Sequence, residues 1–454
     1  MGTTMTSVVT KDRTGPALDG QVLLPGAAGY DEARSVWNAL VDRRPEMIIR
    51  CRSVDDVVTA VRTARERDLE IGIRCGGHSA LGFAVPDGGL MIDLTLMNRV
   101  RVDPLRRRAW VQGGALLGAL DAAAQEYGLA TTAGNVSHTG VGGLTLGGGM
   151  GWLARQYGLT CDNVVTFQVV TADGEIIRAS RDEHPDLFWG LRGGGGNFGV
   201  VTEFEFRLHP AGTSALLAEF SFPARQALDA LRGWRDLLPG APRQATFTAD
   251  IGRDGMLALG FVWAGDPGQG RRLIPALRAL GRPVSKRVLD LSYLELQRMS
   301  DSVQKHALRR YSKGHYLREL PDGALEAFLQ RGAGNGQEQY LPNAGLQAYG
   351  GAIAEVPDHD SAFSHRDALV EFGAGTSWRD PAEDQDRIAA ARRCAAALDR
   401  YASGAYINFV NDDGPEAVLR AYSAPKLARL TAVKTAYDPD NVFHLNHNIK
   451  PASR

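Results

Sequence analysis

The spacing of hydrophobic residues divides the chain into two regions that predict different arrangements of strands and helices. Between residues 45 and 210, short apolar runs alternate with amphipathic segments, which predicts strands and helices in turn. Helices are expected after Ser53, which has the character of a helix cap, and over residues 115–129. The strands expected in this region cover residues 47–50, 69–73, 90–94, 100–102, 109–111, 164–171, 176–179 and 200–206.

After Pro210 the hydrophobic runs become longer and glycine becomes rarer. Alternation with a period of two predicts strands at 216–222, 247–251, 257–262 and 347–354, and a helix is expected over 385–400. This region therefore indicates a second domain built on a mostly antiparallel sheet. The remaining residues, 411–454, return to a helical pattern and end in a polar, proline-closed tail that we expect to pack against a specific surface.

The bulk composition excludes several classes of protein. A chain of 454 residues is too long for one ordinary core, so two or three closely packed domains are expected. The net charge of −1 provides no basic field for nucleic acid, and no apolar run is long enough to span a membrane. The first 15 residues contain no signal-like apolar run, so a cytoplasmic protein is expected. Monomer and homodimer both remain open.

Familiar catalytic and metal-binding motifs are absent. The four cysteines (Cys51, Cys75, Cys161 and Cys394) have neither zinc-site nor disulfide-framework spacing, so no metal is expected. There is no GxGxxG in the setting of a Rossmann nucleotide site, and the GxxxxGK[ST], GxSxG and HExxH motifs do not occur.

Glycine is the informative residue. It accounts for 53 of the 454 residues and is concentrated at 76–77, 140–151 and 193–196. Glycine-rich loops let backbone N–H groups approach and wrap a pyrophosphate. His78 directly follows the first cluster. A lone histidine is usually structural, but at the end of a loop of this kind it becomes a candidate cofactor ligand.

A set of motifs distributed over the chain resembles one flavoprotein family. The motifs are RCGGH at 74–78, GVGGLTLGGG at 140–149, GWL at 151–153, DN at 162–163, VTADG at 170–174, DLFW at 186–189, LRGGGGNFGVV at 191–201, YDPDNVF at 437–443 and NxNI at 446–449. Together they resemble the berberine-bridge-enzyme-like branch of the vanillyl-alcohol-oxidase flavoproteins, with a PCMH-type FAD-binding domain. The resemblance runs from about residue 20 to 452 and is strongest to bacterial members such as 6-hydroxy-D-nicotine oxidase and polyketide-tailoring flavoenzymes.

The resemblance implies an α+β fold. Residues 1–210 would form an FAD-binding domain of two α+β subdomains, and residues 211–410 a substrate domain with an antiparallel sheet covered by helices. Residues 411–454 would return to the FAD domain. It also implies FAD as cofactor, O2 as electron acceptor and a small-molecule substrate.

The family's cofactor-binding positions carry over residue by residue. His78 matches the histidine that is joined to the 8α-methyl group of the flavin. Many relatives add a second link through a cysteine at the position of Val136, so a single link is expected here. The other matching positions are Arg74, Cys75, Gly76, Gly77, Ser79, Gly134, Thr139, Gly140, Gly142, Gly143, Gly149, Val201, Tyr406, Asn446 and Asn448.

The catalytic base is less clear from the resemblance. Relatives often carry a catalytic tyrosine in Tyr-x-Asn-Tyr, where this chain has Phe409. On the expected strand 347–354, Gln347 and Tyr349 would share the substrate-facing side. Tyr349 is the first candidate for an acid/base and Glu355 the second. Alternatively, Tyr349 is a packing residue and Glu355 a surface charge.

Two other polar groups remain as candidates. Tyr311 and His315 form a polar pair that ranks behind Tyr349. His138 and Thr139 resemble the same run in a family member that uses a flavin N5-oxide, which would place His138 among the catalytic residues. Alternatively, Thr139 only hydrogen-bonds FAD and His138 is structural.

Three functions follow from these observations. The leading hypothesis is an FAD-dependent oxidase of an aromatic, polyketide or alkaloid-like natural product. A variant is an oxygenase that uses a flavin N5-oxide, and its lower peroxide yield would distinguish it. A third reading, a drug-binding resistance protein, would show no reduction of the flavin by its ligand.

Overall fold

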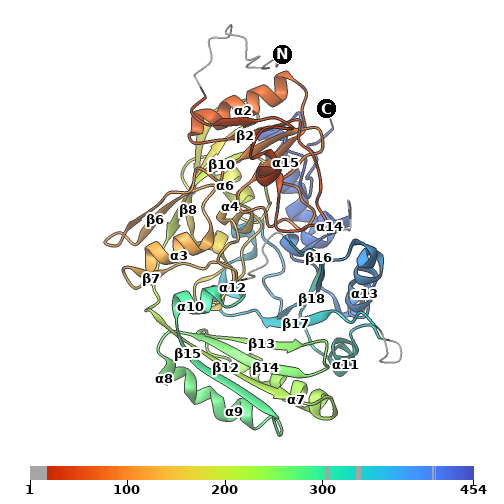
Figure 1. Cartoon of the computed structure of the whole chain (residues 1–454). Coiled ribbons are helices and arrows are strands. Elements are labelled where there is room, and N and C mark those ends of the chain that lie inside the picture. Colours follow the sequence, from red (N-terminus) through yellow and green to blue (C-terminus); the bar gives the residue numbers. More distant parts are fainter. Residues whose placement is uncertain (1–17, 302–306, 334–338, 412–413, 415, 454) are drawn as a thin grey trace.

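The computed structural model describes residues 18–301, 307–333, 339–411, 414 and 416–453. The first 15 residues, which carry no signal-like pattern, lie outside this range. Two sheets from the N-terminal half and the C-terminal helices lie at one end of the molecule (Figure 1). A large antiparallel sheet formed by the following residues lies at the other end (Figure 1). The chain therefore has the expected α+β class.

The first sheet delivers the first glycine-rich loop. Its four strands are ordered β1 (Gln21–Leu23), β2 (Met47–Arg50), β4 (Leu90–Asp93) and β3 (Ile71–Arg74). Strands β2 and β3 each pair in parallel with β4. Helix α2 (Val54–Glu66) begins with a reciprocal capping box between Ser53 and Asp56, as the sequence indicated. Strand β3 ends at Arg74, so the loop that follows leaves from the carboxyl edge of a parallel strand.

The second sheet is antiparallel and supports the other two glycine clusters. Its order is β5 (Val100–Asp103), β6 (Arg108–Gln112), β10 (Val200–Arg207), β8 (Val164–Val170) and β9 (Ile176–Ser180). Helix α3 (Leu117–Gln125) is shorter than predicted, because strand β7 (Leu129–Ala130) pairs with β11 (His209–Pro210). Helices α4 (Val141–Leu146) and α6 (Pro185–Leu191) border the second and third glycine clusters.

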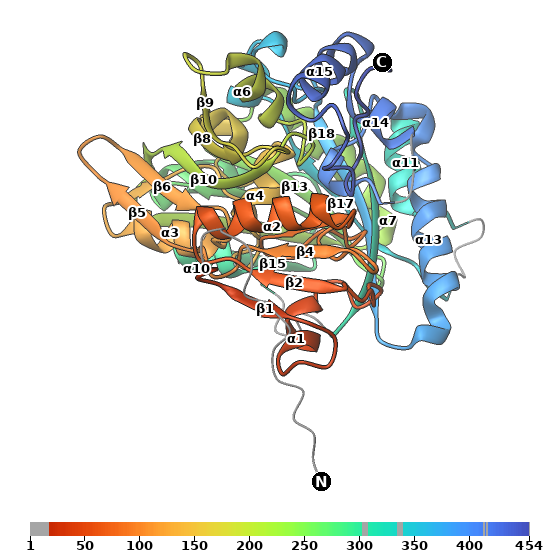
Figure 2. The same ribbon diagram turned by 90° about the horizontal axis from the view of Figure 1, so that it is seen from above.

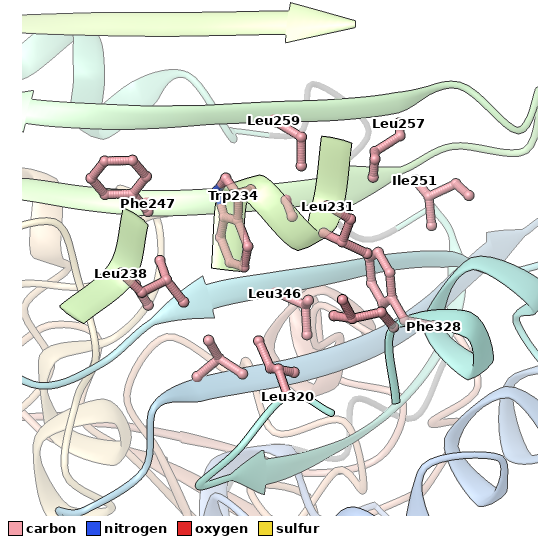
Figure 3. Packing of buried hydrophobic residues seen from close by; sticks show 14 of the residues in the cluster. Leu231, Trp234, Leu238, Phe247, Ile251, Leu257, Leu259, Leu320, Phe328 and Leu346 are labelled. Carbon is pink, nitrogen blue, oxygen red and sulfur yellow. The ribbon is translucent and has the colours of Figure 1, made fainter. Parts of the chain in front are cut away.

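The third sheet has seven antiparallel strands and two unlike faces. Its order is β15 (Ser285–Ser292), β12 (Ser214–Phe222), β14 (Leu257–Ala264), β13 (Ala245–Ile251), β17 (Asn343–Ala348), β18 (Val370–Trp378) and β16 (Arg309–Leu317). Helices α7 (Ala224–Leu237), α11 (Asp322–Gln330) and α13 (Asp384–Ala396) cover one face. Trp234 and Phe328 from these helices pack on Leu259 and Leu346 of the strands (Figure 3). The opposite face is apolar at β12 and β14, where Leu217 and Val262 pack with Trp152, and carries glycine and polar residues at β17 and β18.

The predicted strand over residues 347–354 is wrong in its second half. Strand β17 ends at Ala348, and Gly350 and Gly351 follow with φ of +83° and +58°. These left-handed conformations, which favour glycine, turn the chain into the short helix α12 (Ala352–Glu355). The alternation of sides that was expected along 347–354 therefore stops after Ala348.

The C-terminal segment packs on the third glycine cluster. Helix α14 (Glu416–Ala421) precedes α15 (Ala424–Tyr437), which lies beside α6 (Figure 2). The buried Lys434 ammonium forms an ion pair with Asp438 at 2.6 Å and donates to the carbonyl of Asn197 at 2.8 Å. The amide of Ile449 donates to Oδ1 of Asn197 at 2.9 Å. The tail thus fixes the loop that contains residues 193–197.

The remaining helices are short: α1 (Tyr30–Arg34), α5 (Ala154–Tyr157), α8 (Pro267–Gly270), α9 (Ile274–Arg278) and α10 (Tyr293–Arg298). Among the described residues, no helix combines the length and the apolar character that crossing a membrane requires.

Candidate active site

A cavity of about 590 Å³ lies between the glycine-rich loops and the β17–β18 side of the seven-stranded sheet. One wall comes from residues 75–80, 134–144, 194–201 and 443–447. The facing wall is formed by Ser312, Gly345, Gln347, Glu371 and Gly373 of the sheet, with residues 406–411 beside it. The cavity therefore brings together every glycine cluster that the sequence singled out.

Two glycine-rich loops touch through their backbones at this cavity. A Cβ atom on Gly76 would lie 2.3 Å from the amide nitrogen of Gly140, and one on Gly140 would lie 2.3 Å from that of Gly76. Gly77 has a φ of +69°. Side chains at these positions would push the loops apart, so glycine is required here by packing and by backbone conformation.

Most of the predicted cofactor residues reach the cavity. The lining includes Cys75, Gly76, Gly77, His78, Ser79, Gly134, Thr139, Gly140, Gly142, Gly143, Val201, Tyr406 and Asn446. Arg74, Gly149 and Asn448 are not part of it. The Arg74 guanidinium donates to the carbonyl of Ala33, and the amide of Gly149 donates to the Tyr406 hydroxyl at 2.8 Å. These two residues stabilise the wall from behind.

His78 is held by three neighbours. Its ring stacks on Trp37 with centroids 5.0 Å apart. Nε2 lies 2.8 Å from Nδ1 of His138, and Nδ1 lies 3.3 Å from the hydroxyl of Thr139. His138 itself does not line the cavity, so the structure places it behind His78 and not among residues that could touch substrate.

The three predicted acid/base residues lie in different surroundings. Gln347 lines the cavity, and its Oε1 accepts a hydrogen bond from Asn135 at 3.1 Å. Tyr349 is fully buried outside the lining, because the strand has already ended. Glu355 lies at the end of α12 in an exposed ion pair with Arg243. Neither Tyr349 nor Glu355 therefore lines the cavity.

Sequence reasoning missed Glu371 on β18, which faces the cavity directly opposite Gln347. Its side chain is buried, with Oε2 accepting a 2.8 Å hydrogen bond from the Tyr349 hydroxyl. Desolvation raises the pKa of Glu371 to about 7, although the Tyr349 hydrogen bond opposes this shift. The signal in the sequence was a lone carboxylate within an otherwise apolar strand.

The Tyr349 hydroxyl belongs to a buried pair of phenols. It lies 3.3 Å from the hydroxyl of Tyr316, and burial holds the pKa of Tyr349 well above its ordinary value. A phenol with so high a pKa stays protonated and donates. Tyr349 therefore orients Glu371 and cannot itself act as the base.

The other predicted polar pair lies apart from the cavity. His315 is buried under α13, where Nε2 lies 3.0 Å from the carbonyl of Ala395 and Nδ1 accepts from Arg420 at 2.6 Å. Tyr311 is beside Trp378 in a separate cluster. Phe409, at the usual tyrosine position, does line the cavity and packs edge-on against Tyr406 with centroids 5.5 Å apart.

The donors and acceptors of the cavity fit a flavin dinucleotide. Four buried side-chain atoms of its wall have no hydrogen-bond partner among the described residues: Asn135 Oδ1, Gln347 Nε2, Glu371 Oε1 and Asn446 Oδ1. Buried polar groups normally have partners. Uncommitted amide and carboxylate groups opposite bare glycine backbone match a ligand with a pyrophosphate and a polar ring.

Comparison with known proteins agrees with this chemistry. Residues 45–180 match the family model described as "FAD binding domain", and residues 405–450 match "Berberine and berberine like". The (R)-6-hydroxynicotine oxidase of Paenarthrobacter nicotinovorans is 33% identical, over 96% of this chain and 97% of that protein. The glucooligosaccharide oxidase of Sarocladium strictum is 28% identical over 93% of this chain and 91% of that protein.

Solved structures share the whole architecture. The crystal structure of 6-hydroxy-D-nicotine oxidase from Arthrobacter nicotinovorans has a TM-score of 0.85 and 30% identity, covering 97% of this chain and 100% of that one. A glucooligosaccharide oxidase from Acremonium strictum, whose name describes a 6-S-cysteinyl, 8α-N1-histidyl FAD, has a TM-score of 0.87 and 25% identity, covering 96% and 98%. The protein is an FAD-linked oxidoreductase. It belongs to the berberine-bridge-enzyme-like family of oxidases, which use FAD as cofactor and O2 as electron acceptor.

Proposed function

We propose that this protein is an oxidase that carries its FAD on His78 through a single covalent link. In this proposal it oxidises a small aromatic, polyketide or alkaloid-like molecule at a carbon that bears a hydroxyl or amine. Bound FAD supplies the two-electron acceptor, and O2 removes the electrons as H2O2. The protein's own residues have to bind the substrate, exclude water and take one proton.

The single observation that carries this proposal is the open oxygen of Glu371. Oε2 is held by Tyr349, whereas Oε1 is buried and has no hydrogen-bond partner among the described residues, on a side chain that lines the cavity. A pKa of about 7 leaves the carboxylate substantially ionised near neutral pH and basic enough to take a hydroxyl or ammonium proton. Glu371 thus supplies the base that Phe409 cannot.

The neighbouring wall residues support a flat substrate. Gly345 and Gly373 lie opposite each other on β17 and β18, next to Gln347 and Glu371. A Cβ on Gly373 would meet nothing within 4 Å, so open space adjoins the carboxylate. The missing side chain of Gly373 leaves room for a ring to lie against β18 while Gln347 offers its amide nitrogen. We therefore favour an aromatic or polycyclic substrate.

The test combines a linkage assay with an activity assay. The purified protein is denatured in acid, and we expect the yellow colour to stay with the polypeptide and to be released from His78→Ala. H2O2 release is then measured with (R)-6-hydroxynicotine, a glucooligosaccharide and a panel of benzylic alcohols and amines. Glu371→Gln should keep its flavin and lose turnover. Full activity in Glu371→Gln would refute its role, and failure of every probe to bleach the flavin would favour a binding protein.

An oxygenase is the second candidate, and Thr139 is the observation that favours it. Thr139 lines the cavity, and its hydroxyl lies 3.3 Å from Nδ1 of His78, the residue proposed for flavin attachment. A hydrogen-bond donor at this place is suited to hold an oxygenated cofactor. An oxygenase would incorporate label from 18O2 into its product, with less than one H2O2 per turnover, whereas the oxidase yields one unlabelled product per H2O2.

A further inference from the structure

The cavity side of the seven-stranded sheet continues beyond the residues that line the cavity. Gly345 of β17, which lines the cavity, lies directly opposite Gly373 of β18 on one side and Asp250 of β13 on the other. Residues opposite each other on neighbouring strands, and residues two apart on one strand, share a face of the sheet. Asp250 therefore lies on the same face as Gln347 and Glu371, one strand beyond the cavity wall.

The carboxylate of Asp250 leans towards the cavity. A Cβ atom on Gly345 would lie 2.7 Å from Oδ1 of Asp250, so the carboxylate occupies the space that a side chain at position 345 would fill. On the neighbouring strand, a Cβ atom on Gly373 would meet nothing within 4 Å. No side chain of the sheet therefore separates the open space above Gly373 from the carboxylate of Asp250.

Asp250 combines a desolvated carboxylate with the lack of a counter-ion. In the described part of the chain, its carboxylate takes part in no ion pair or side-chain hydrogen bond. Water reaches the side chain, yet the surrounding protein desolvates it and raises its pKa to about 7, and the charge of Glu219 adds to this shift. A cationic ligand would supply the opposite charge that the protein does not provide.

The other charges on this face also favour a cation. Glu219 of β12 and Glu371 of β18 lie in one row across the sheet, on either side of Asp250. Arg287 of β15 lies on the far side of Glu219 from Asp250. A carboxylate or phosphate group placed beside Asp250 would therefore meet like charges, which disfavours its binding.

We propose that Asp250 binds a cationic group of the substrate, an ammonium that is remote from the carbon to be oxidised. This inference rests on the proposed function, because it assigns the reacting end of the substrate to Glu371. It narrows the substrate class to molecules with a hydroxyl or amine at one end of a flat core and a protonated amine at the other end.

The strand pairing sets the distance between the two ends of such a substrate. Glu371 and Asp250 are two strands and two residues apart, which places their Cα atoms about 12 Å from each other. Because the Asp250 carboxylate leans towards Gly345, the ammonium should lie roughly 8–12 Å from the reacting oxygen or nitrogen. One ring that carries a short chain, or a few fused rings, spans this distance.

The experiment measures binding and oxidation of matched probes by the FAD-loaded protein. The probes are benzyl alcohols whose para-alkoxy chain ends in an ammonium, a hydroxyl or a carboxylate group. A further probe, para-aminomethylbenzyl alcohol, keeps its ammonium too close to the ring to reach Asp250. Binding is followed by the change in the visible flavin spectrum, and oxidation by H2O2 release. The wild type should prefer the long ammonium probe to the hydroxyl probe by about tenfold in both Kd and kcat/KM.

Two substitutions of Asp250 test the site in opposite directions. Asp250→Asn should remove most of the preference for the long ammonium probe, whereas Asp250→Lys should reverse it in favour of the carboxylate probe. A reversed preference is a gain that a misfolded variant does not show. Asp182→Asn is the control, because it removes one charge from an exposed position after β9, and it should keep the preference of the wild type.

The outcomes distinguish this inference from the proposed function. Equal use of the long ammonium and hydroxyl probes by the wild type, or a preference that survives in Asp250→Asn, would overturn the role of Asp250 and leave the oxidation in place. Binding of the ammonium probe that depends on Asp250, without reduction of the flavin, would support the cation site and contradict the proposed reaction. Absence of binding for every probe would overturn both.

Discussion

Tyr349 donates a hydrogen bond to Oε2 of Glu371 at 2.8 Å, and of these two residues only Glu371 lines the cavity. Gln347, two residues earlier, lies opposite the same carboxyl on the cavity side. One oxygen of Glu371 is therefore fixed by the protein while the other remains available. The different surroundings of the two carboxyl oxygens of Glu371 underlie the first two predictions.

Replacing Glu371 by glutamine should strongly reduce turnover and stabilise the fold. We expect kcat to fall by about 10² to 10⁴, the usual contribution of a positioned base, with normal FAD content. Burial raises the folded-state pKa from 4.5 to about 7, so ionisation of this carboxyl destabilises the native state as pH rises through that interval. Chemical denaturation at pH 8 should show Glu371→Gln more stable by up to about 3 kcal/mol, and the gain should vanish near pH 4.

Replacing Tyr349 by phenylalanine should shift the pH dependence of the reaction. The Tyr349 hydrogen bond lowers the pKa of Glu371 against the effect of burial, so its loss should raise that pKa further. Because the base has to be ionised, kcat/KM falls as pH drops through about 7 in wild type, and this acidic limb should move to higher pH in the variant. Tyr316→Phe, which lacks a direct bond to the carboxylate, serves as control. An unchanged limb would exclude Glu371 as the titrating group.

The buried ion pair of Asp162 and Arg366 should matter for stability and not for chemistry. The guanidinium makes two bonds, of 2.7 and 3.0 Å, to the carboxylate, and both side chains are buried. Asp162→Asn leaves the arginine charge without its counter-ion, which should lower the free energy of unfolding by about 3–5 kcal/mol. The exposed pair of Glu355 and Arg243 gives the contrast, since Glu355→Gln should cost at most about 1 kcal/mol. Urea denaturation compares the two variants.

Gly140→Ala should produce a protein that lacks FAD. The added Cβ would lie 2.3 Å from the amide nitrogen of Gly76 and 2.4 Å from Sγ of Cys75, so the two loops have to separate. We expect colourless or weakly yellow protein with near-normal circular dichroism. Gly240→Ala is the control, because a Cβ at Gly240 meets nothing within 4 Å. This variant should retain the visible flavin absorbance of the wild type. Normal flavin content in Gly140→Ala would show that contact between the loops is dispensable.

The cofactor loops were predictable because their requirements are local. Glycines 76, 77 and 140 are demanded by backbone contact and by φ, and a motif in the sequence records both. The predicted cofactor residues that do not line the cavity depend on distant neighbours. Arg74 lies next to the predicted loop but turns to the carbonyl of Ala33, and nothing in the sequence around Arg74 specifies that partner.

The residues of the sheet wall were harder to predict from the sequence, because their proximity depends on how the strands pair. Gln347 and Glu371 become neighbours only through the pairing of β17 with β18, across 24 positions of sequence. The period-two argument also continued too far, since β17 ends at Ala348 and Gly350 and Gly351 turn the chain into α12 before Glu355. His138 also depends on a distant neighbour: its side chain contacts His78, from a loop 60 residues earlier, and does not line the cavity.

The two unlike faces of the seven-stranded sheet have an evolutionary consequence. Along β17 and β18, hydrophobic side chains of the core beneath the covering helices alternate with the residues that meet the cavity. A mutation on the cavity side therefore exchanges a substrate contact without opening the core, and a mutation on the core side leaves the contact surface in place. Such a sheet can diversify its chemistry one position at a time, which makes it a ready source of new specificities in a lineage that keeps the same flavin.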